Sequence, residues 1–330
     1  MKKNNTNKKT KKEGSNPFAT VLRFIKPYRF LTAFLVVFTL VATVLSLIIP
    51  KYIGYILDAA VKMENYDNLV RDMVALVLIS LLIGAIQMVA GVYLSQKVAF
   101  DLRLAISTKI SKQTFKFINK ITAPKLLSIL TSDVDAIRDL ISQSLILLFS
   151  SIFLIIGAGA LMLSINVPMG IAGLLIIPVI GGGFMYVFKK LGPLFLQSRT
   201  IIDNLNRVIS ENIVGASLIR VLNSQNREEN KLETYNVQSR ELGFKILNGF
   251  AFMFPFVNLA SSIGGVAILY IGGNQLLNGN IKPGDFVTFF TYLGVLIWPV
   301  ITLGFISNVI SRAFISIGRL DEVLDSRIEE

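Results

Sequence analysis

The sequence of 330 residues contains no cysteine and no histidine. Disulfide bonds, thiolate or imidazole metal sites, cysteine nucleophiles and Ser-His-Asp triads are therefore excluded from this chain. It also lacks the GxxxxGK[ST] loop that binds nucleotide phosphates, so these residues build no P-loop site for ATP. We expect no catalytic residue, metal or cofactor to be held by this chain itself.

Charged residues are scarce, at 16% of the chain, whereas 53% of the residues are hydrophobic and the mean hydropathy is +0.62. Soluble domains are about 25% charged, so this composition is better suited to lipid than to water. The net charge of +12 comes from blocks of Lys and Arg that are separated by long uncharged runs. A nucleic-acid groove needs continuous positive charge, so we do not expect nucleic acid as a partner.

Six apolar stretches without Asp, Glu, Lys or Arg are each long enough to cross a bilayer. A helix needs about 20 apolar residues to cross a hydrocarbon core of about 30 Å. The stretches run approximately Phe30 to Pro50, Met73 to Ser95, Leu140 to Ser164, Met169 to Phe188, Ile246 to Ile271 and Phe286 to Ser311. The sequence therefore predicts an all-α polytopic membrane protein with six spans.

The distribution of basic residues predicts how the chain is oriented in the membrane. Met1 to Arg29 carries nine Lys and Arg, Lys97 to Arg138 eight and Lys189 to Lys245 nine, whereas the intervening loops have few. Short loops rich in Lys and Arg stay in the cytoplasm. We therefore expect a multi-pass protein of the plasma membrane with both termini cytoplasmic.

The two long inner loops keep a helical pattern of apolar residues. Val98, Leu102 and Ile106 recur at helical spacing beyond the second span, and a helix from Asp72 to Phe117 would be about 68 Å long at about 1.5 Å per residue. Similar patterns extend spans three and four. We expect spans two to five to continue into the cytoplasm as stiff helices.

Each pair of extended helices must turn at its tip. The first predicted turn lies near Asn119 to Ser128, with a helix start at Pro124, and the second near Glu211 to Arg220, where Gly215 interrupts the helical pattern. Two interpretations stay open, namely a docking surface and a helix hairpin that packs on itself. The apolar tip residues at issue are Ile121, Leu126, Leu127, Val214, Ala216 and Leu218.

Several stretches carry a family likeness when they are taken together and in this order. They are an amphipathic segment before span one, pieces of both inner loops, and the start and exit of span six: Phe18 to Pro27, Asp101 to Arg103, Ser128 to Val134, Glu211 to Arg220, Ile281 to Phe286, Tyr292, Pro299 and Ile317 to Asp325. This set resembles the transmembrane domain of the type I ATP-binding cassette (ABC) exporters. The family usually has Gly in place of Pro124 and Arg in place of Ile129, which puts the standard geometry of the first tip in doubt.

The resemblance implies a division of the chain. Residues 1–16 would be a basic tail, 17–28 an elbow helix, 29–316 the six-helix transmembrane domain and 317–330 the start of a linker to a nucleotide-binding domain outside this sequence. We expect that the chain is a truncation of such a protein. The implied partners are a second transmembrane subunit, identical or related, in a domain-swapped dimer, together with nucleotide-binding domains that hold ATP and Mg²⁺.

The resemblance also implies roles for particular residues. The two tips would be coupling helices that contact the nucleotide-binding domains through Pro124, Lys125, Ser128, Glu211, Gly215 and Ala216. Polar groups inside the spans are candidates for the substrate cavity, namely Gln87, Asn258, Ser262 and Asn308. Uncharged polar residues in membrane bundles also form hydrogen bonds between helices, so that interpretation stays open for all four.

The resulting hypothesis is the membrane domain of an ABC exporter that moves a hydrophobic or amphipathic substrate by alternating access. A secondary transporter usually needs ionisable residues inside the membrane, and the six spans have none. A non-ABC membrane transporter and a membrane scaffold remain the alternatives. The sequence does not indicate the substrate, nor does it separate a homodimer from a heterodimer.

Overall fold

The computed structural model describes residues 22–326, apart from the side chains of Lys120 and Asn308. The predicted tail 1–16 and the first residues of the elbow segment lie outside this part. Within it the chain is helical and has no strand. Six helical segments are long and apolar enough to cross a membrane, which confirms the predicted number of spans: Leu22–Val61, Asp67–Ser111, Ala123–Ile165, Val167–Val214, Gln225–Leu277 and Pro283–Leu324.

These segments are much longer than a bilayer is thick. The shortest has 40 residues and the longest 53, which corresponds to about 60 to 80 Å at about 1.5 Å per residue. The hydrocarbon core takes up only about 30 Å. The predicted continuation of the spans as helices outside the membrane is thus present.

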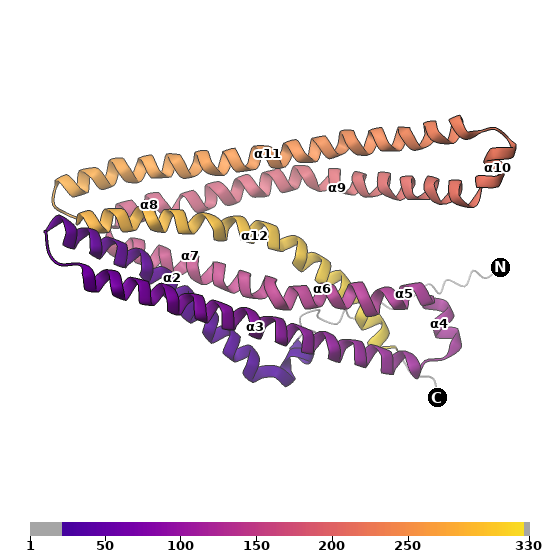
Figure 1. Ribbon diagram of the computed structural model, residues 1–330, viewed down its shortest axis with the longest axis horizontal. Helices are drawn as coiled ribbons and strands as arrows, with labels where there is room; N and C mark the ends of the chain where they lie inside the picture. Colours follow the sequence, from indigo (N-terminus) through magenta and orange to yellow (C-terminus); the bar gives the residue numbers. More distant parts are fainter. Residues whose placement is uncertain (1–21, 327–330) are drawn as a thin grey trace, which may run out of the picture. The chain divides into compact units, whose positions relative to one another are not determined.

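The chain divides into two compact units, and the first contains residues 22–158 and 305–326 of the described part. Its longest helices, α2 (Arg29–Val61) and α3 (Asp67–Ser111), lie side by side (Figure 1). The third span is one continuous helix assembled from α5 (Ala123–Ser128), α6 (Val134–Asp139) and α7 (Leu145–Ile165), joined by π-helical turns η2 (Ile129–Asp133) and η3 (Leu140–Ser144).

The core of the first unit is built from three segments that are far apart in the sequence. Leu102 and Ile106 come from α3, Val134 and Ile137 from α6, and Ile317, Leu320 and Val323 from the end of α12 (Pro283–Leu324). All seven side chains are at most 2% exposed. The exit of span six is therefore packed against the first inner loop.

The second unit contains residues 159–304. Helices α9 (Ile176–Val214) and α11 (Gln225–Leu277) run side by side, and the short α10 (Ala216–Val221) connects them at one end (Figure 1). The helix α8 (Val167–Leu174) precedes α9 and begins where the Asn166 side chain accepts a hydrogen bond from the backbone nitrogen of Met169. Glycine allows close packing here, because a Cβ at Gly183 would lie 2.1 Å from Cε1 of Phe256.

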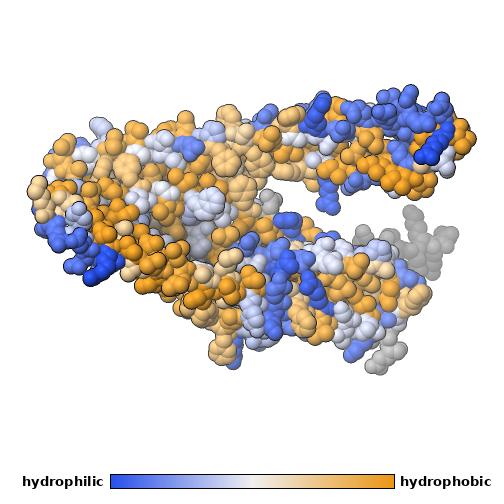
Figure 2. Space-filling model, viewed as in Figure 1, coloured by the Kyte–Doolittle hydropathy of each residue, from blue (hydrophilic) through white to orange (hydrophobic). Residues whose placement is uncertain are grey.

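Polar and apolar surfaces separate along the second unit. Figure 2 shows hydrophilic residues gathered toward the ends of α9 and α11 near α10, and mostly hydrophobic residues farther along both helices. In the first unit, the most hydrophobic stretch of 18 residues within α3 contains no buried residue. Leu82, Met88 and Val89 are 65–70% exposed. Water disfavours such surfaces, so they are consistent with contact to lipid.

Two predicted boundaries differ from the structure. Helix α3 ends at Ser111 and does not continue to Phe117, because Lys112 leaves the helical conformation and the separate helix α4 (Phe115–Ile121) follows. The tip helix α5 begins at Ala123, one residue before the predicted Pro124. Thr122 makes the turn between α4 and α5 with φ of 74°, which is unusual for a residue other than glycine.

Candidate functional site

The second tip has the predicted break between two helices. Helix α9 ends at Val214, and the backbone nitrogen of Gly215 donates a hydrogen bond to the carbonyl oxygen of Glu211 at 2.8 Å. A Cβ at Gly215 would lie 2.9 Å from that same oxygen, so a larger residue would strain this tight turn. The structure therefore brings the predicted Glu211, Gly215 and Ala216 together on one turn, with Glu211 and Ala216 exposed.

The same tip carries an apolar surface, which we call the α10 patch. Its five residues are 60–84% exposed: Ile213, Val214, Leu218, Val221 and Leu222. Exposed apolar clusters on a polar background mark interaction surfaces. Docking at this tip stays a prediction, and the exposure of these five side chains is compatible with it.

The first tip behaves differently. Ile121 and Leu126 are only 7% and 5% exposed and belong to the core of the first unit, whereas Leu127 is 61% exposed. Pro124 and Lys125 are exposed and Ser128 is half-buried. This tip is packed into the core that it shares with α3 and the end of α12, and its accessible residues are mainly those on α5.

The two stretches assigned to the first inner loop meet in the structure. The Arg103 side chain donates from Nη2 to Oδ1 of Asp135 at 2.8 Å, and from Nε to the carbonyl oxygen of Leu130 at 3.3 Å. Arg138 approaches the same Asp135 oxygen at 3.0 Å. Helix α3 is thereby fixed against η2 and α6 by contacts at half-exposed side chains.

A buried carboxylate joins the first tip to the exit of span six. Oδ1 of Asp133 accepts a hydrogen bond from Oγ of Ser316 at 2.8 Å and forms an ion pair with Nη2 of Arg319 at 2.7 Å. Asp133 and Ser316 are 2% and 3% exposed, and Oδ2 of Asp133 has no hydrogen-bond partner among the described residues. We call these three residues the Asp133 cluster.

The sequence interpretation missed this cluster, although a signal was present. Asp133 lies four residues from both Ile129 and Ile137, so it occupies the apolar face of the helix. An acid on such a face is buried only when it is paired. Its partners on α12 are 183 and 186 residues away in the sequence, and no pattern identifies them.

Two further contacts join the end of α12, and the residues just after it, to the first tip and the turn before it. Nζ of Lys125 lies 3.3 Å from Oε2 of Glu322, and Nε2 of Gln113 donates to Oγ of Ser326 at 2.6 Å. Together with the Asp133 cluster, they fix the last turns of α12 at three points. A force applied to the first tip or to the end of α12 would therefore act on both.

The candidate substrate residues lie on three helices, α3, α11 and α12. Gln87 on α3 donates to Oγ1 of Thr39 on α2 at 2.8 Å, which is a hydrogen bond between helices. Asn258 and Ser262 are exposed on one face of α11, one helical turn apart. Asn308 lies in α12, and its side chain is outside the described part. Their role in substrate binding stays a prediction.

Comparison with known proteins now decides the family. The sequence profile of the ABC transporter transmembrane region matches residues 32–300. The chain belongs to the ABC transporter transmembrane region family. This assignment agrees with the six long helices and with the resemblance read from the sequence.

Relatives of this ABC membrane domain cover nearly all of it. The Uncharacterized ABC transporter ATP-binding protein YfiB of Bacillus subtilis is 24% identical over 312 residues, 94% of this chain and 54% of the relative. The ATP-dependent lipid A-core flippase of Syntrophus aciditrophicus is 24% identical over 93% of this chain and 52% of its own length. The Multidrug resistance-like ATP-binding protein MdlA of Buchnera aphidicola is 24% identical over 92% and 53%. The chain thus spans about half the length of these relatives.

Proposed function

We propose that this chain is the translocating half of an ATP-driven exporter of the plasma membrane, with both termini in the cytoplasm. It would move a hydrophobic or amphipathic molecule by alternating access. Family membership supports this proposal, as do relatives named as a lipid A-core flippase and as a multidrug resistance-like protein. The uncharged spans are compatible with such a substrate.

The ATP would be bound and hydrolysed, with Mg²⁺, by nucleotide-binding domains, because this sequence has no P-loop. A second transmembrane subunit, identical or related, would complete the translocation path in a domain-swapped dimer. The fully helical connections between membrane and tips support this arrangement, since a packed helix transmits a displacement that a flexible loop would absorb.

The α10 patch carries the proposal. Five large apolar side chains remain 60–84% exposed near the polar ends of α9 and α11, where the rest of the second unit does not cover them. A groove on a nucleotide-binding domain would bury them. Burial of a single leucine or valine side chain contributes about 1.5–3 kcal/mol before the cost of association is subtracted, so burial of this patch would favour the contact.

The test uses the full-length transporter reconstituted in proteoliposomes. Leu218→Asp introduces a charge into the α10 patch, and we expect ATP-dependent transport to be lost while insertion into the membrane is unchanged. Reversing the charge of the exposed Glu211 should have the same effect. Met63→Asp is the matched control, because Met63 is 95% exposed in the loop after α2 and its φ of 57° is tolerated by Asp. Unchanged transport by Leu218→Asp would contradict coupling at this tip.

A further inference from the structure

A basic groove lies where the chain enters its first membrane span. Arg23, Lys26 and Arg29 follow each other at intervals of three residues, so they share one side of the helical segment, and all three are exposed. They line a groove of about 760 Å³ that continues along α2 past Thr32, Ala33 and Val36. We call it the entry groove.

The three cations of the entry groove are available to an anionic ligand. None of them forms an ion pair with a residue in the described part of the chain. Tyr28, on the same turn, donates its hydroxyl to Asp101 at 2.8 Å, so that carboxylate is already bound. Arg29 lies 5.1 Å from the ring centroid of its neighbour Phe30, which is 79% exposed.

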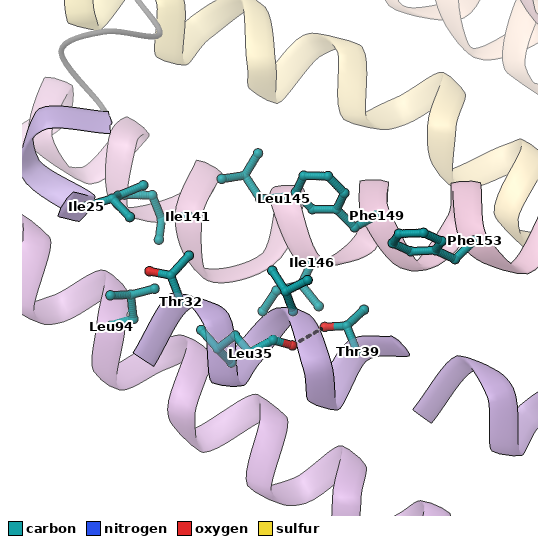
Figure 3. A pocket seen from close by; sticks show the side chains of 11 residues that line it. Ile25, Thr32, Leu35, Thr39, Leu94, Ile141, Leu145, Ile146, Phe149 and Phe153 are labelled. Carbon is teal, nitrogen blue, oxygen red and sulfur yellow. Dashed lines mark hydrogen bonds between the residues drawn. The ribbon is translucent and has the colours of Figure 1, made fainter. Parts of the chain in front are cut away.

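The entry groove leads into an apolar pocket between α2 and the third span. The two share Ile25, Thr32 and Val36, and the pocket continues to Leu35, Phe149 and Phe153 (Figure 3). Its volume is about 60 Å³, several times the roughly 10–15 Å³ that one water requires. It can therefore accept part of a ligand, such as the end of a hydrocarbon chain.

The pocket has little to offer a polar ligand. The hydroxyl of Thr32 donates to the carbonyl oxygen of Tyr28 at 3.1 Å, and that of Thr39 donates to the carbonyl oxygen of Leu35 at 2.7 Å (Figure 3). Thr39 Oγ1 also accepts the hydrogen bond from Gln87. The remaining walls are aliphatic and aromatic side chains, which bind hydrocarbon and disfavour an anion.

From this continuity we propose that the entry groove and its pocket bind an anionic phospholipid of the adjacent leaflet. Arg23, Lys26 and Arg29 hold the phosphate of the head group, and one acyl chain runs along Ala33 and Val36 with its end against Phe149 and Phe153. Positive charge directly followed by an apolar channel matches an amphiphile of this kind. The lipid is a ligand of the membrane domain itself, and its binding requires neither ATP nor transport.

Two other occupants fit less well. Residues 1–13 carry Lys2, Lys3, Lys8, Lys9, Lys11 and Lys12 with only Glu13 as an acid, so this stretch of sequence offers no net negative charge to three cations. A free phosphate would use the cations but leave the apolar pocket unfilled. The phospholipid uses both.

Native mass spectrometry of the detergent-purified chain tests this proposal, because it counts bound lipids directly. The probes are dioleoylphosphatidylglycerol and dioleoylphosphatidylcholine, which share acyl chains and differ in net charge, and glycerol 3-phosphate, which lacks acyl chains. We expect tight binding of the first lipid, weak binding of the second and no displacement by millimolar glycerol phosphate. Displacement by glycerol phosphate would show a free-anion site and overturn the proposal.

Two pairs of variants separate the head-group site from the acyl site. Changing Arg23, Lys26 and Arg29 to Gln should weaken phosphatidylglycerol binding about fivefold per cation and on the order of 100-fold in total. The control changes the exposed Lys189, Lys190 and Arg199 on α9 to Gln, which removes the same charge elsewhere. If both triple variants weaken lipid binding equally, the effect is due to the net charge of the protein, and the proposed head-group site is wrong.

Val36→Trp tests the acyl site, because Val36 lines both the groove and the pocket. Val37→Trp is its control, since Val37 is 54% exposed and lines neither. We expect only Val36→Trp to weaken binding. A chain without residues 1–16 should bind lipid as the whole chain does, and a large gain in binding would instead show that this segment occupies the groove. None of these experiments measures transport. The lipid-binding proposal can therefore be wrong while the proposed exporter function is right, and the reverse.

Discussion

The Asp133 cluster predicts how firmly the exit of span six is held to the first tip. Ser316→Ala removes one hydrogen bond to a buried, charged acceptor and changes the side-chain volume little. Such bonds contribute about 1.5–3 kcal/mol. The high part of this range applies because Asp133 and Ser316 are at most 3% exposed, so water cannot replace the lost hydroxyl.

Hydrogen–deuterium exchange measures this local stability without unfolding the whole membrane protein. If the last turns of α12 open as a unit, a loss of about 1.5–3 kcal/mol raises amide exchange in residues 313–324 by about 10- to 150-fold. Ser311→Ala is the matched control, because Ser311 is exposed and its hydroxyl donates to Ser307 within the same helix. We expect the control to change exchange by no more than about twofold.

A double-mutant cycle tests whether the faster exchange comes from the contact between Asp133 and Ser316. Asp133→Ala should also accelerate exchange of residues 313–324, and a coupling energy of about 0.5–3 kcal/mol is expected between Asp133→Ala and Ser316→Ala. Ser316→Ala exchange rates within twofold of the parent, or strictly additive effects of the two changes, would refute the reasoning.

The remaining predictions concern packing and surface contacts, each measured as a shift in the thermal melting temperature in detergent. Gly183→Ala should destabilise by about 1–3 kcal/mol, because its Cβ would meet Phe256 at 2.1 Å, whereas Gly182→Ala, with nothing within 4 Å, should not; equal shifts would contradict this. Gln87→Leu should cost about 0.6–1.7 kcal/mol by removing one interhelical hydrogen bond, and no shift would argue against that bond. Lys125→Ala should cost at most about 1 kcal/mol, because its ion pair is half exposed; a larger loss would show a stronger contact.

Several features of the fold could be predicted from the sequence because they follow from local patterns. The six spans follow from the length of uncharged apolar runs, and the helical extensions follow from the spacing of residues such as Leu102 and Ile106. The second tip was found because Gly215 interrupts such a pattern. In each case the neighbours in the sequence supply enough information.

Other features could not be predicted, because only long-range packing decides them. Ile121, Leu126 and Leu218 are all large apolar residues near a predicted helix tip. The first two are nevertheless buried in the core, whereas Leu218 is 60% exposed. Helix α3 ends at Ser111, and Gln113, two residues beyond this end, donates a hydrogen bond to Ser326, 213 residues later. A pattern of apolar residues cannot show which of them a distant helix will cover.

The sequence by itself determined that the protein lies in lipid, that its fold is all-α and that it has six membrane-spanning helices. Each of these depends on the free energy of transferring a local segment into lipid. Only the tertiary structure decided that Asp133 meets Ser316 and Arg319, that Gln87 meets Thr39, and that three cations and an apolar pocket form one continuous groove. These juxtapositions depend on how separate helices pack, and nothing within a single helix encodes its partner.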